Sequence, residues 1–376
     1  MKILFISMPS VHVIRWIENL KDTSHELFWF DVLGRGRLDT LESVTQVVNW
    51  KKRKVKYIKG EYFLSKKFPT VYEKVCPYLE VTANEALKYV LLDIKPDVVH
   101  SFEMQGCSYP IFKVMQECSN IKWLYSCWGN DLYYYQQFPI HLKKIKLVLS
   151  RVNYLHTDCK RDFELAKQLG FQGKHVGVIP GGTGYKLQDL EIYKLPLEDR
   201  KIILVKGYEH HLGRGLNIIM ALEAIKNQIE NYEVVVFGAH TKVINYINSQ
   251  NLNFTVFDRH GLSHDELLKI MGRSLIYVGN SISDGMPNTL LEAIVMGIFP
   301  IQSNPGGVTG EIIENGKNGF LIQDPNNIKE IQQHIEEALK DNERLRNAQS
   351  INHSISRQLD YFLNQKKVVE LYERFR

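Results

Sequence analysis

Short apolar runs alternate with longer segments of helical periodicity along most of the chain, and this alternation limits the fold more than any other feature. Residues 2–7 form the first apolar run, and Ile14, Ile17 and Leu20 then follow at helical spacing. Strands separated by helices pair in parallel, because each crossover brings the chain back to the same end of the sheet. The sequence therefore predicts an α/β protein with helices on both faces of parallel sheets.

The alternation is interrupted once, near the middle of the chain. Pro180-Gly181-Gly182 ends the first series of strands, and a second series begins at Ile202. A chain of 376 residues is long enough for two domains. We expect two Rossmann-like domains that face each other across a cleft. The predicted bounds are 1–187 for the first domain, 188–200 for a linker, 201–354 for the second domain, and 355–376 for a helix that returns to the first domain.

Composition excludes several classes of protein. Hydrophobic residues make up 44% and charged residues 24% of the chain, as in ordinary globular proteins. The apolar runs are far shorter than the roughly 20 residues of a membrane-spanning helix, and the first is too short for a signal peptide. Five cysteines without a Cys-x-x-Cys pair favour neither a disulfide framework nor a zinc site. We therefore expect a cytoplasmic protein with reduced thiols.

The net charge differs between the two halves. Residues 1–190 hold 27 Lys and Arg against 19 Asp and Glu, a net of +8, whereas residues 191–376 hold 20 against 23, a net of −3. A moderately basic half suits an anionic surface or a phosphate-bearing ligand. Without a nucleic-acid-binding motif, this balance gives no support for a nucleic acid partner.

Six of the nine residues from Lys51 to Lys59 are basic, and aromatic residues border them on both sides. Basic side chains mixed with aromatic ones favour the surface of an anionic membrane. An ordinary solvated loop explains the same pattern, so both interpretations stay open.

The densest chemical signal runs from Ser281 to Ala293, directly after an apolar strand. A Gly/Pro turn leads into a helix, and the amides at the start of a helix attract anions such as a diphosphate. Glu292 lies about one turn inside this helix, suited to ribose hydroxyls, and Asp284 lies on the loop where a sugar could bind. Alternatively, Asp284 and Thr289 are helix caps and Glu292 completes a capping box.

The block Ser283-Asp-Gly-Met-Pro-Asn-Thr-Leu-Leu-Glu-Ala-Ile-Val-Met-Gly, with Pro305-Gly-Gly and Asn315-Gly-Lys-Asn-Gly downstream, resembles retaining glycosyltransferase family 4 and its GT-B fold. The start of the chain and Pro96-Asp-Val-Val-His100 also look like this family. The resemblance implies transfer of a sugar from a nucleotide diphosphate sugar to an acceptor hydroxyl, in surface polysaccharide or glycolipid assembly. A lipid-linked saccharide is one such acceptor.

The resemblance also implies roles for individual residues. The expected catalytic residues are Lys206, Arg214, Asp284 and Asp131. The expected donor-binding residues are Gly285, Met286, Pro287, Asn288, Thr289, Leu290 and Glu292, and those on the acceptor side are His12, His100, Trp128 and Asn130. Helix capping by Asn130 or Asp131, and structural roles for the two histidines, stay open. No Asp-x-Asp element calls for a divalent ion, so we expect a reaction without metal or cofactor.

This sequence departs from the family pattern at four positions. Asp284 stands where the family usually has Glu, and Arg214 where it usually has Lys. Tyr208 occupies the usual place of an Arg, which leaves Lys206 as the candidate replacement. Trp128 lies near a turn where many relatives have His.

Three other functions are weighed against glycosyl transfer. A nucleotide-sugar epimerase of the same fold would form its product without an acceptor. A non-catalytic nucleotide-sugar-binding protein would bind the donor without turnover. A dinucleotide oxidoreductase is disfavoured, because the Gly-x-Gly-x-x-Gly fingerprint is absent after the first strand of either domain.

Overall fold

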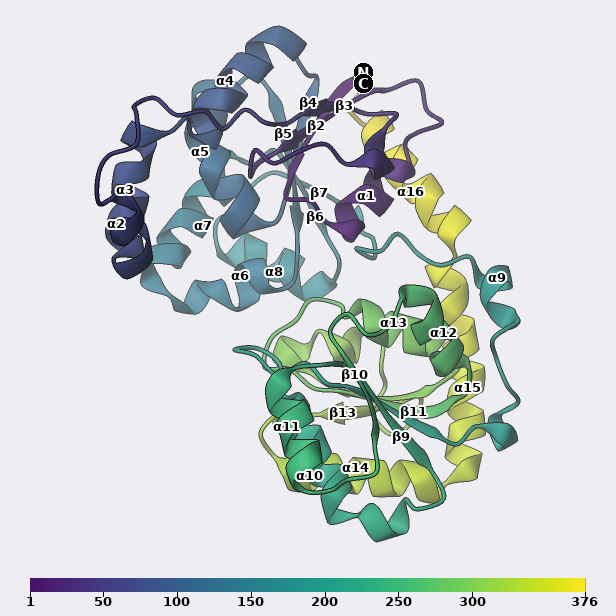
Figure 1. Ribbon diagram of the computed structural model, residues 1–376. Helices are drawn as coiled ribbons and strands as arrows, with labels where there is room; N and C mark the ends of the chain where they lie inside the picture. Colours follow the sequence, from purple (N-terminus) through teal and green to yellow (C-terminus); the bar gives the residue numbers. More distant parts are fainter. Residues whose placement is uncertain (376) are drawn as a thin grey trace. The chain divides into compact units, whose positions relative to one another are not determined.

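The computed structural model describes residues 1–375 and divides them into two compact units (Figure 1). The first unit contains Met1–Thr157, Asp162–Ile179 and the residues from Lys367 onward. The second contains Asp158–Arg161 and Pro180–Lys366, so the segment expected as a linker belongs to it. Arg376, the end of the predicted last helix, lies outside the described residues.

The first unit is built on a seven-stranded parallel sheet in the order β3-β2-β1-β4-β5-β6-β7. The order reverses between β1 and β4. The strand bounds are Lys2–Ser7 (β1), Glu26–Asp31 (β2), Thr45–Val47 (β3), Val98–Phe102 (β4), Lys122–Cys127 (β5), Tyr154–Thr157 (β6) and Lys174–Val178 (β7). The sequence predicted six of these, and β3 was missed because three residues carry almost no periodic signal.

Helices cover both faces of this sheet, because alternate strand residues point to opposite sides. Leu4 and Ile6 pack on the face covered by α4, α5 and α7, whereas Ile3 and Phe5 pack on the face covered by α1 and α16 (Figure 1). The helices are α1 (Val11–Glu18), α2 (Glu61–Lys67), α3 (Pro69–Leu79), α4 (Ala83–Ile94), α5 (Tyr109–Glu117), α6 (Asn130–Tyr133), α7 (Pro139–Arg151), α8 (Lys160–Gln168) and α16 (Tyr361–Glu373).

The second unit repeats the architecture with a six-stranded parallel sheet in the order β10-β9-β8-β11-β12-β13. Its strands are Ile202–Lys206 (β8), Glu233–Ala239 (β9), Thr255–Asp258 (β10), Ser274–Gly279 (β11), Phe299–Ser303 (β12) and Phe320–Ile322 (β13). Its helices are α9 (Leu187–Glu191), α10 (Gly215–Ala224), α11 (Thr241–Ser249), α12 (His264–Gly272), α13 (Asn288–Val295), α14 (Ile328–Lys340) and α15 (Asn342–Ser356). The predicted pair of Rossmann-like domains is confirmed.

The last helix, α16, belongs to the first unit from Lys367 onward. Four side chains near its C-terminal end are buried in that unit's core: Val368, Leu371, Tyr372 and Phe375. Trp16 of α1 donates from Nε1 to the Tyr372 hydroxyl across 2.8 Å. This packing confirms that the last helix returns to the first domain. Within residues 1–375, no helix combines the length and apolarity that crossing a membrane requires.

Candidate functional site

The candidate site of the second unit lies where its strand order reverses. β8 and β11 are paired side by side in parallel, so both end at the same edge of the sheet. In doubly wound sheets, ligands bind beyond this edge, at the point of reversal. The loop over 207–214 leaves β8 here, and the loop over 280–287 leaves β11.

Hydrogen bonds between backbone atoms join these two loops. Gly213 and Ser281 form an antiparallel bridge, and the Ile282 amide donates to the Leu212 carbonyl at 2.9 Å. The Arg214 amide donates to the Asn280 carbonyl at 3.0 Å. The loops over 207–214 and 280–287, far apart in sequence, therefore form one substructure.

Two glycines make the close packing around Tyr208 possible. A Cβ atom on Gly213 would lie 2.4 Å from the Tyr208 carbonyl oxygen. Gly238, at the end of β9, has a φ of +61°, and a Cβ there would lie 2.4 Å from the Tyr208 ring. Only glycine fits both positions without moving the tyrosine.

The two predicted cations behave differently. Lys206 places its Nζ atom 4.7 Å from the centre of the Tyr208 ring, a cation–π contact at the end of β8. Arg214 donates to the carbonyls of Gly213 at 2.8 Å and of His210 at 3.1 Å, and to Asn326 Oδ1 at 3.3 Å. The guanidinium of Arg214 thus braces its own loop.

Histidines next to this loop form a cluster that the sequence analysis missed. The ring centres of Tyr208, His210 and His240 lie 5.5 to 6.1 Å apart. Nδ1 of His210 accepts hydrogen bonds from the amides of Leu212 at 3.1 Å and Gly213 at 3.3 Å. Partial burial, with His211 and His240 nearby, lowers the pKa of His210 to about 4. The neutral ring therefore shapes the loop that carries Arg214.

The loop over 280–287 leads into α13, whose N-cap is Pro287. Proline has no side-chain oxygen, so no side chain of the N-cap caps this helix, and the helix dipole attracts negative charge to its first turn. Thr289 lies two residues beyond the N-cap and cannot form the capping box with Glu292 that the sequence allowed. That alternative interpretation was wrong.

Glu292 is almost fully buried and lies close to a histidine from another helix. Its Oε1 atom is 2.8 Å from Nε2 of His264, at the start of α12. Asp284 accepts the Gly285 amide on Oδ1 at 3.0 Å, and its carbonyl accepts a hydrogen bond from Arg161 of the same unit at 2.9 Å. No sequence pattern pointed to His264, because its helix lies outside the recognised motif.

A buried tyrosine lies beneath both carboxylates. Burial first, and then the charges of Asp284 and Glu292, raise the pKa of Tyr277 well above its usual value. The Tyr277 hydroxyl has no hydrogen-bond partner within residues 1–375. The two acidic side chains predicted from the motif therefore act on a common point at the end of β11.

On the acceptor side, two of the predicted residues come together in the first unit. His12 of α1 and Trp128, just after β5, have ring centres 5.9 Å apart in an edge-to-face arrangement. Both are half-buried, and they follow β1 and β5, the two strands on either side of β4. Asn130 is the first residue of α6, with Gly129 as the N-cap.

Asp131 is enclosed within the first unit. Its Oδ2 atom accepts from the Tyr125 hydroxyl at 2.7 Å and from the amides of Met104 and Trp128 at 3.0 Å each. Burial and the nearby charge of Glu103 raise the pKa of Asp131 well above its usual range. This carboxyl ties β5 to the segments at Met104 and Trp128, a structural role in place of the catalytic one that was expected.

His100 also lies in the core rather than on an open face. Its Nδ1 atom is 2.5 Å from the Tyr372 hydroxyl, and its Nε2 atom is 2.7 Å from Oγ of Ser126. Ser126 Oγ is 2.8 Å from Nδ1 of His156, whose Nε2 atom is 3.0 Å from the Ile179 carbonyl. A hydrogen-bonded chain therefore runs through the centre of the first unit.

The two ends of this chain fix the direction of every hydrogen bond in it. The Trp16 indole can only donate, and the Ile179 carbonyl can only accept. Each histidine then carries one proton, on Nε2, and both rings are neutral. Burial lowers the pKa of His156 to about 3 and that of His100 well below its usual value. His100 thus has a structural role in this arrangement.

Comparison with known proteins supports this description of the second unit. Residues 188–354 match the sequence model of a family described as Glycosyl transferases group 1. No curated protein sequence matches the chain.

Solved structures match over the whole length. Sucrose-phosphate synthase of Thermosynechococcus elongatus is 15% identical, with a TM-score of 0.71 over 100% of this chain and 98% of that one. HepE of Anabaena, in complex with UDP and glucose, is 15% identical, with a TM-score of 0.69 and full coverage of both chains. Trehalose 6-phosphate synthase of Burkholderia multivorans is 12% identical, with a TM-score of 0.69 over 99% and 96%. Residues 188–354 therefore match the glycosyl transferases group 1 family, and the whole chain shares with these structures a fold of two Rossmann-like domains.

Proposed function

We propose that this protein is a glycosyltransferase that moves a sugar from a nucleotide diphosphate sugar to an acceptor hydroxyl, with retention of configuration at the anomeric carbon. The observation that supports this most strongly is the joined pair of loops after β8 and β11. These loops place basic residues, the N-terminal end of α13 and two carboxylates at one edge of the sheet.

In this proposal the donor diphosphate binds at the first turn of α13, over residues 285–290, where backbone amides and the helix dipole attract negative charge. Lys206 and Arg214 stabilise the charge that develops on the diphosphate as its bond to the sugar breaks. Arg214 reaches the diphosphate by exchanging its carbonyl contacts for phosphate oxygens. These fixed charges take the place of a metal ion, so we propose a reaction without cofactor.

The carboxylates have separate roles. Glu292 accepts hydrogen bonds from the ribose hydroxyls, and His264 holds it in place for that purpose. Asp284 contacts the donor sugar from the loop. Because Asp is shorter than the Glu usual at this position, we expect a donor sugar that comes closer to the loop. His12 and Trp128 contribute to acceptor binding in the first unit.

A uridine donor is the first to test, because HepE, which shares the fold, was solved with UDP and with UDP-glucose. For the acceptor we propose a saccharide or lipid-linked saccharide in surface polysaccharide or glycolipid assembly. Such an acceptor would bring the enzyme to a membrane surface.

A thermal-shift screen of nucleotide diphosphates and their sugars tests the donor. A ligand at 100 times its Kd stabilises the folded state by about 2.7 kcal/mol. Incubation of the matching donor with oligosaccharide acceptors should then release nucleoside diphosphate, and NMR should show a product with the donor's anomeric configuration. An inverted product would exclude the retaining mechanism. Product without acceptor would indicate an epimerase, and binding without turnover a non-catalytic protein.

A further inference from the structure

Exposed apolar side chains are concentrated in one short part of the first unit. The structure exposes 21 large hydrophobic side chains among the described residues, and nine of them fall within residues 55–78. They are Val55, Tyr57, Ile58, Tyr62, Phe63, Phe68, Val71, Val75 and Tyr78. This segment contains the loop before α2, helix α2 and helix α3 (Figure 1). Apolar side chains gathered on one exposed segment mark a surface that binds a partner.

The same segment is strongly basic. Residues 50–79 contain nine Lys and Arg and two Asp and Glu, a net charge of +7. This is most of the excess of +8 found over residues 1–190. A partner for this face must therefore be anionic as well as apolar.

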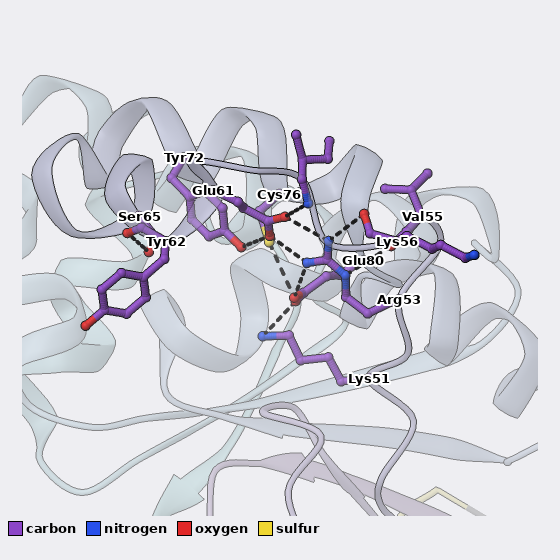
Figure 2. A network of polar contacts seen from close by, with 11 residues as sticks. Lys51, Arg53, Val55, Lys56, Glu61, Tyr62, Ser65, Tyr72, Cys76 and Glu80 are labelled. Carbon is purple, nitrogen blue, oxygen red and sulfur yellow. Dashed lines mark hydrogen bonds and ion pairs between the residues drawn. The ribbon is translucent and has the colours of Figure 1, made fainter.

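Seven of the nine basic residues fall into two groups, an inner group held in ion pairs and an outer group that is exposed. The inner group forms a clasp, the network of Arg53, Glu61, Tyr72 and Glu80 shown in Figure 2. Arg53 donates to both oxygens of the buried Glu61 carboxylate, at 2.5 and 2.8 Å, and to Glu80 at 3.3 Å. Lys51 forms an ion pair with Glu80 at 3.4 Å, and Lys54 forms one with Glu85 at 2.6 Å. These cations hold the segment in place.

The outer group is Lys56, Lys59, Lys66 and Lys67, all exposed. They alternate with exposed Tyr57, Ile58, Tyr62 and Phe63, and the Lys66 ammonium lies 5.8 Å from the centre of the Tyr62 ring. Figure 2 shows the Tyr62 side chain directed away from the clasp. Exposed lysines and exposed apolar side chains thus alternate along the loop over 55–60 and α2.

We propose that the loop over 55–60 and helix α2 dock on the surface of an anionic lipid bilayer. Aromatic and aliphatic side chains enter the boundary between headgroups and acyl chains, while lysines bind the lipid phosphates. A protein partner fits less well, because lysine is depleted in protein–protein interfaces. Because the clasp already holds the backbone of this segment in place, docking costs little conformational entropy. This deepens the proposed function by giving a lipid-linked acceptor a docking site, but its test does not rest on catalysis.

Co-sedimentation with vesicles tests the inference. The full chain is mixed at low salt with vesicles of equal parts phosphatidylglycerol and phosphatidylcholine, or of phosphatidylcholine alone. The parent should pellet with the anionic vesicles only and be released at about 0.5 M salt, because salt screens the lysine contacts. Replacement of Lys56, Lys59, Lys66 and Lys67 by Ser should lower the partition coefficient on the order of a hundredfold. Replacement of Ile58, Tyr62 and Phe63 by Ser should lower it as well.

The matched control removes four exposed lysines from the second unit, by Lys226→Ser, Lys242→Ser, Lys329→Ser and Lys340→Ser. This variant has the same net charge as the lysine variant and should pellet like the parent. Equal losses in both variants, or no pelleting of the parent, would overturn the proposal. All variants leave the clasp intact, and far-ultraviolet circular dichroism checks that each is folded. Donor binding, measured by thermal shift, reports separately on the proposed function and should be the same in every variant.

Discussion

At the residue scale, the hydrogen bond between Glu292 and His264 shows how one side chain is held in position for a ligand. The 2.8 Å contact holds a nearly buried carboxylate in one position before the donor arrives. Replacement of Glu292 by Gln keeps the size of the side chain and the hydrogen bond to His264. It weakens the hydrogen bonds that the side chain accepts from the ribose hydroxyls, because Gln carries no charge. We expect donor affinity and turnover to fall about tenfold or more, since a hydrogen bond to a charged group contributes about 1.5–3 kcal/mol. Calorimetry with UDP and steady-state kinetics measure this.

The control for this variant is Glu314→Gln, an exposed carboxylate elsewhere in the second unit. It makes the same chemical change and should leave donor binding as it is. If Glu292→Gln binds and reacts like the parent, Glu292 only supports the packing of α13 against α12.

His210 gives a second prediction at this scale, because only one atom of its ring shapes the loop. Nδ1 accepts two amide hydrogen bonds from the loop that carries Arg214. Asn places its Oδ1 atom where His places Nδ1, whereas Phe has no acceptor there. We expect His210→Phe to lower kcat at little change in KM, and His210→Asn to restore most of it. The same loss in both variants would show that the loop does not depend on this acceptor.

At the scale of elements, the clasp beneath α2 predicts a local dependence on pH. The hydrogen bonds from Arg53 first, and then those from Ile58 and Tyr72, lower the pKa of Glu61 to about 2 from its ordinary 4.5. A carboxyl with a lowered pKa stabilises the fold above its ordinary pKa, and this contribution is lost as the pH falls from about 4.5 toward 2. Glu61→Gln should remove it at every pH.

Hydrogen exchange followed by mass spectrometry measures this effect. Peptides covering residues 53–60 should exchange faster in Glu61→Gln than in the parent at neutral pH, while peptides from β1 and β4 should not change. Glu73→Gln on α3, an exposed carboxylate with the same change in charge, is the control. Unchanged protection in Glu61→Gln would contradict the role given to the clasp.

The elements also show which features can be predicted from sequence. All the strands except β3, together with α13, were predicted because their signals are local: apolar runs, a Gly/Pro turn and the helical spacing after Asn288. His264 and His210 could not be predicted, because their partners are set by how separate loops fold together. His100 was misplaced because a strand pattern does not show that Tyr372, 272 residues later, covers it.

At the scale of the whole molecule, the neutral histidines in the core predict sensitivity of the first unit to acid. His156, with a pKa of about 3, stays neutral in the folded state, whereas an unfolded histidine gains a proton below its ordinary 6.5. The unfolded state then binds more protons, so stability falls as the pH falls from 6.5 toward 3. The loss amounts to about 1.4 kcal/mol per pH unit for each such histidine.

Urea unfolding between about pH 7.5 and pH 5.5 measures this slope. His156→Gln keeps a donor for the Ile179 carbonyl but cannot titrate, so its stability should depend less on pH than that of the parent. His260→Gln, at an exposed histidine of the second unit, is the control and should keep the full slope. The same slope in all three proteins would place the acid sensitivity elsewhere.

The return of α16 to the first unit has a consequence for the order of events during synthesis. Tyr372 and Phe375 complete the core around Trp16 and His100, yet they leave the ribosome after the entire second unit. At about 5–20 residues per second, roughly 190 residues separate Ile179 from this helix, a delay of about 10 to 40 s. During that time Trp16 and His100 lack their partner, so the nascent first unit exposes apolar surface that invites chaperones. The second unit, whose core is complete earlier, is able to fold first.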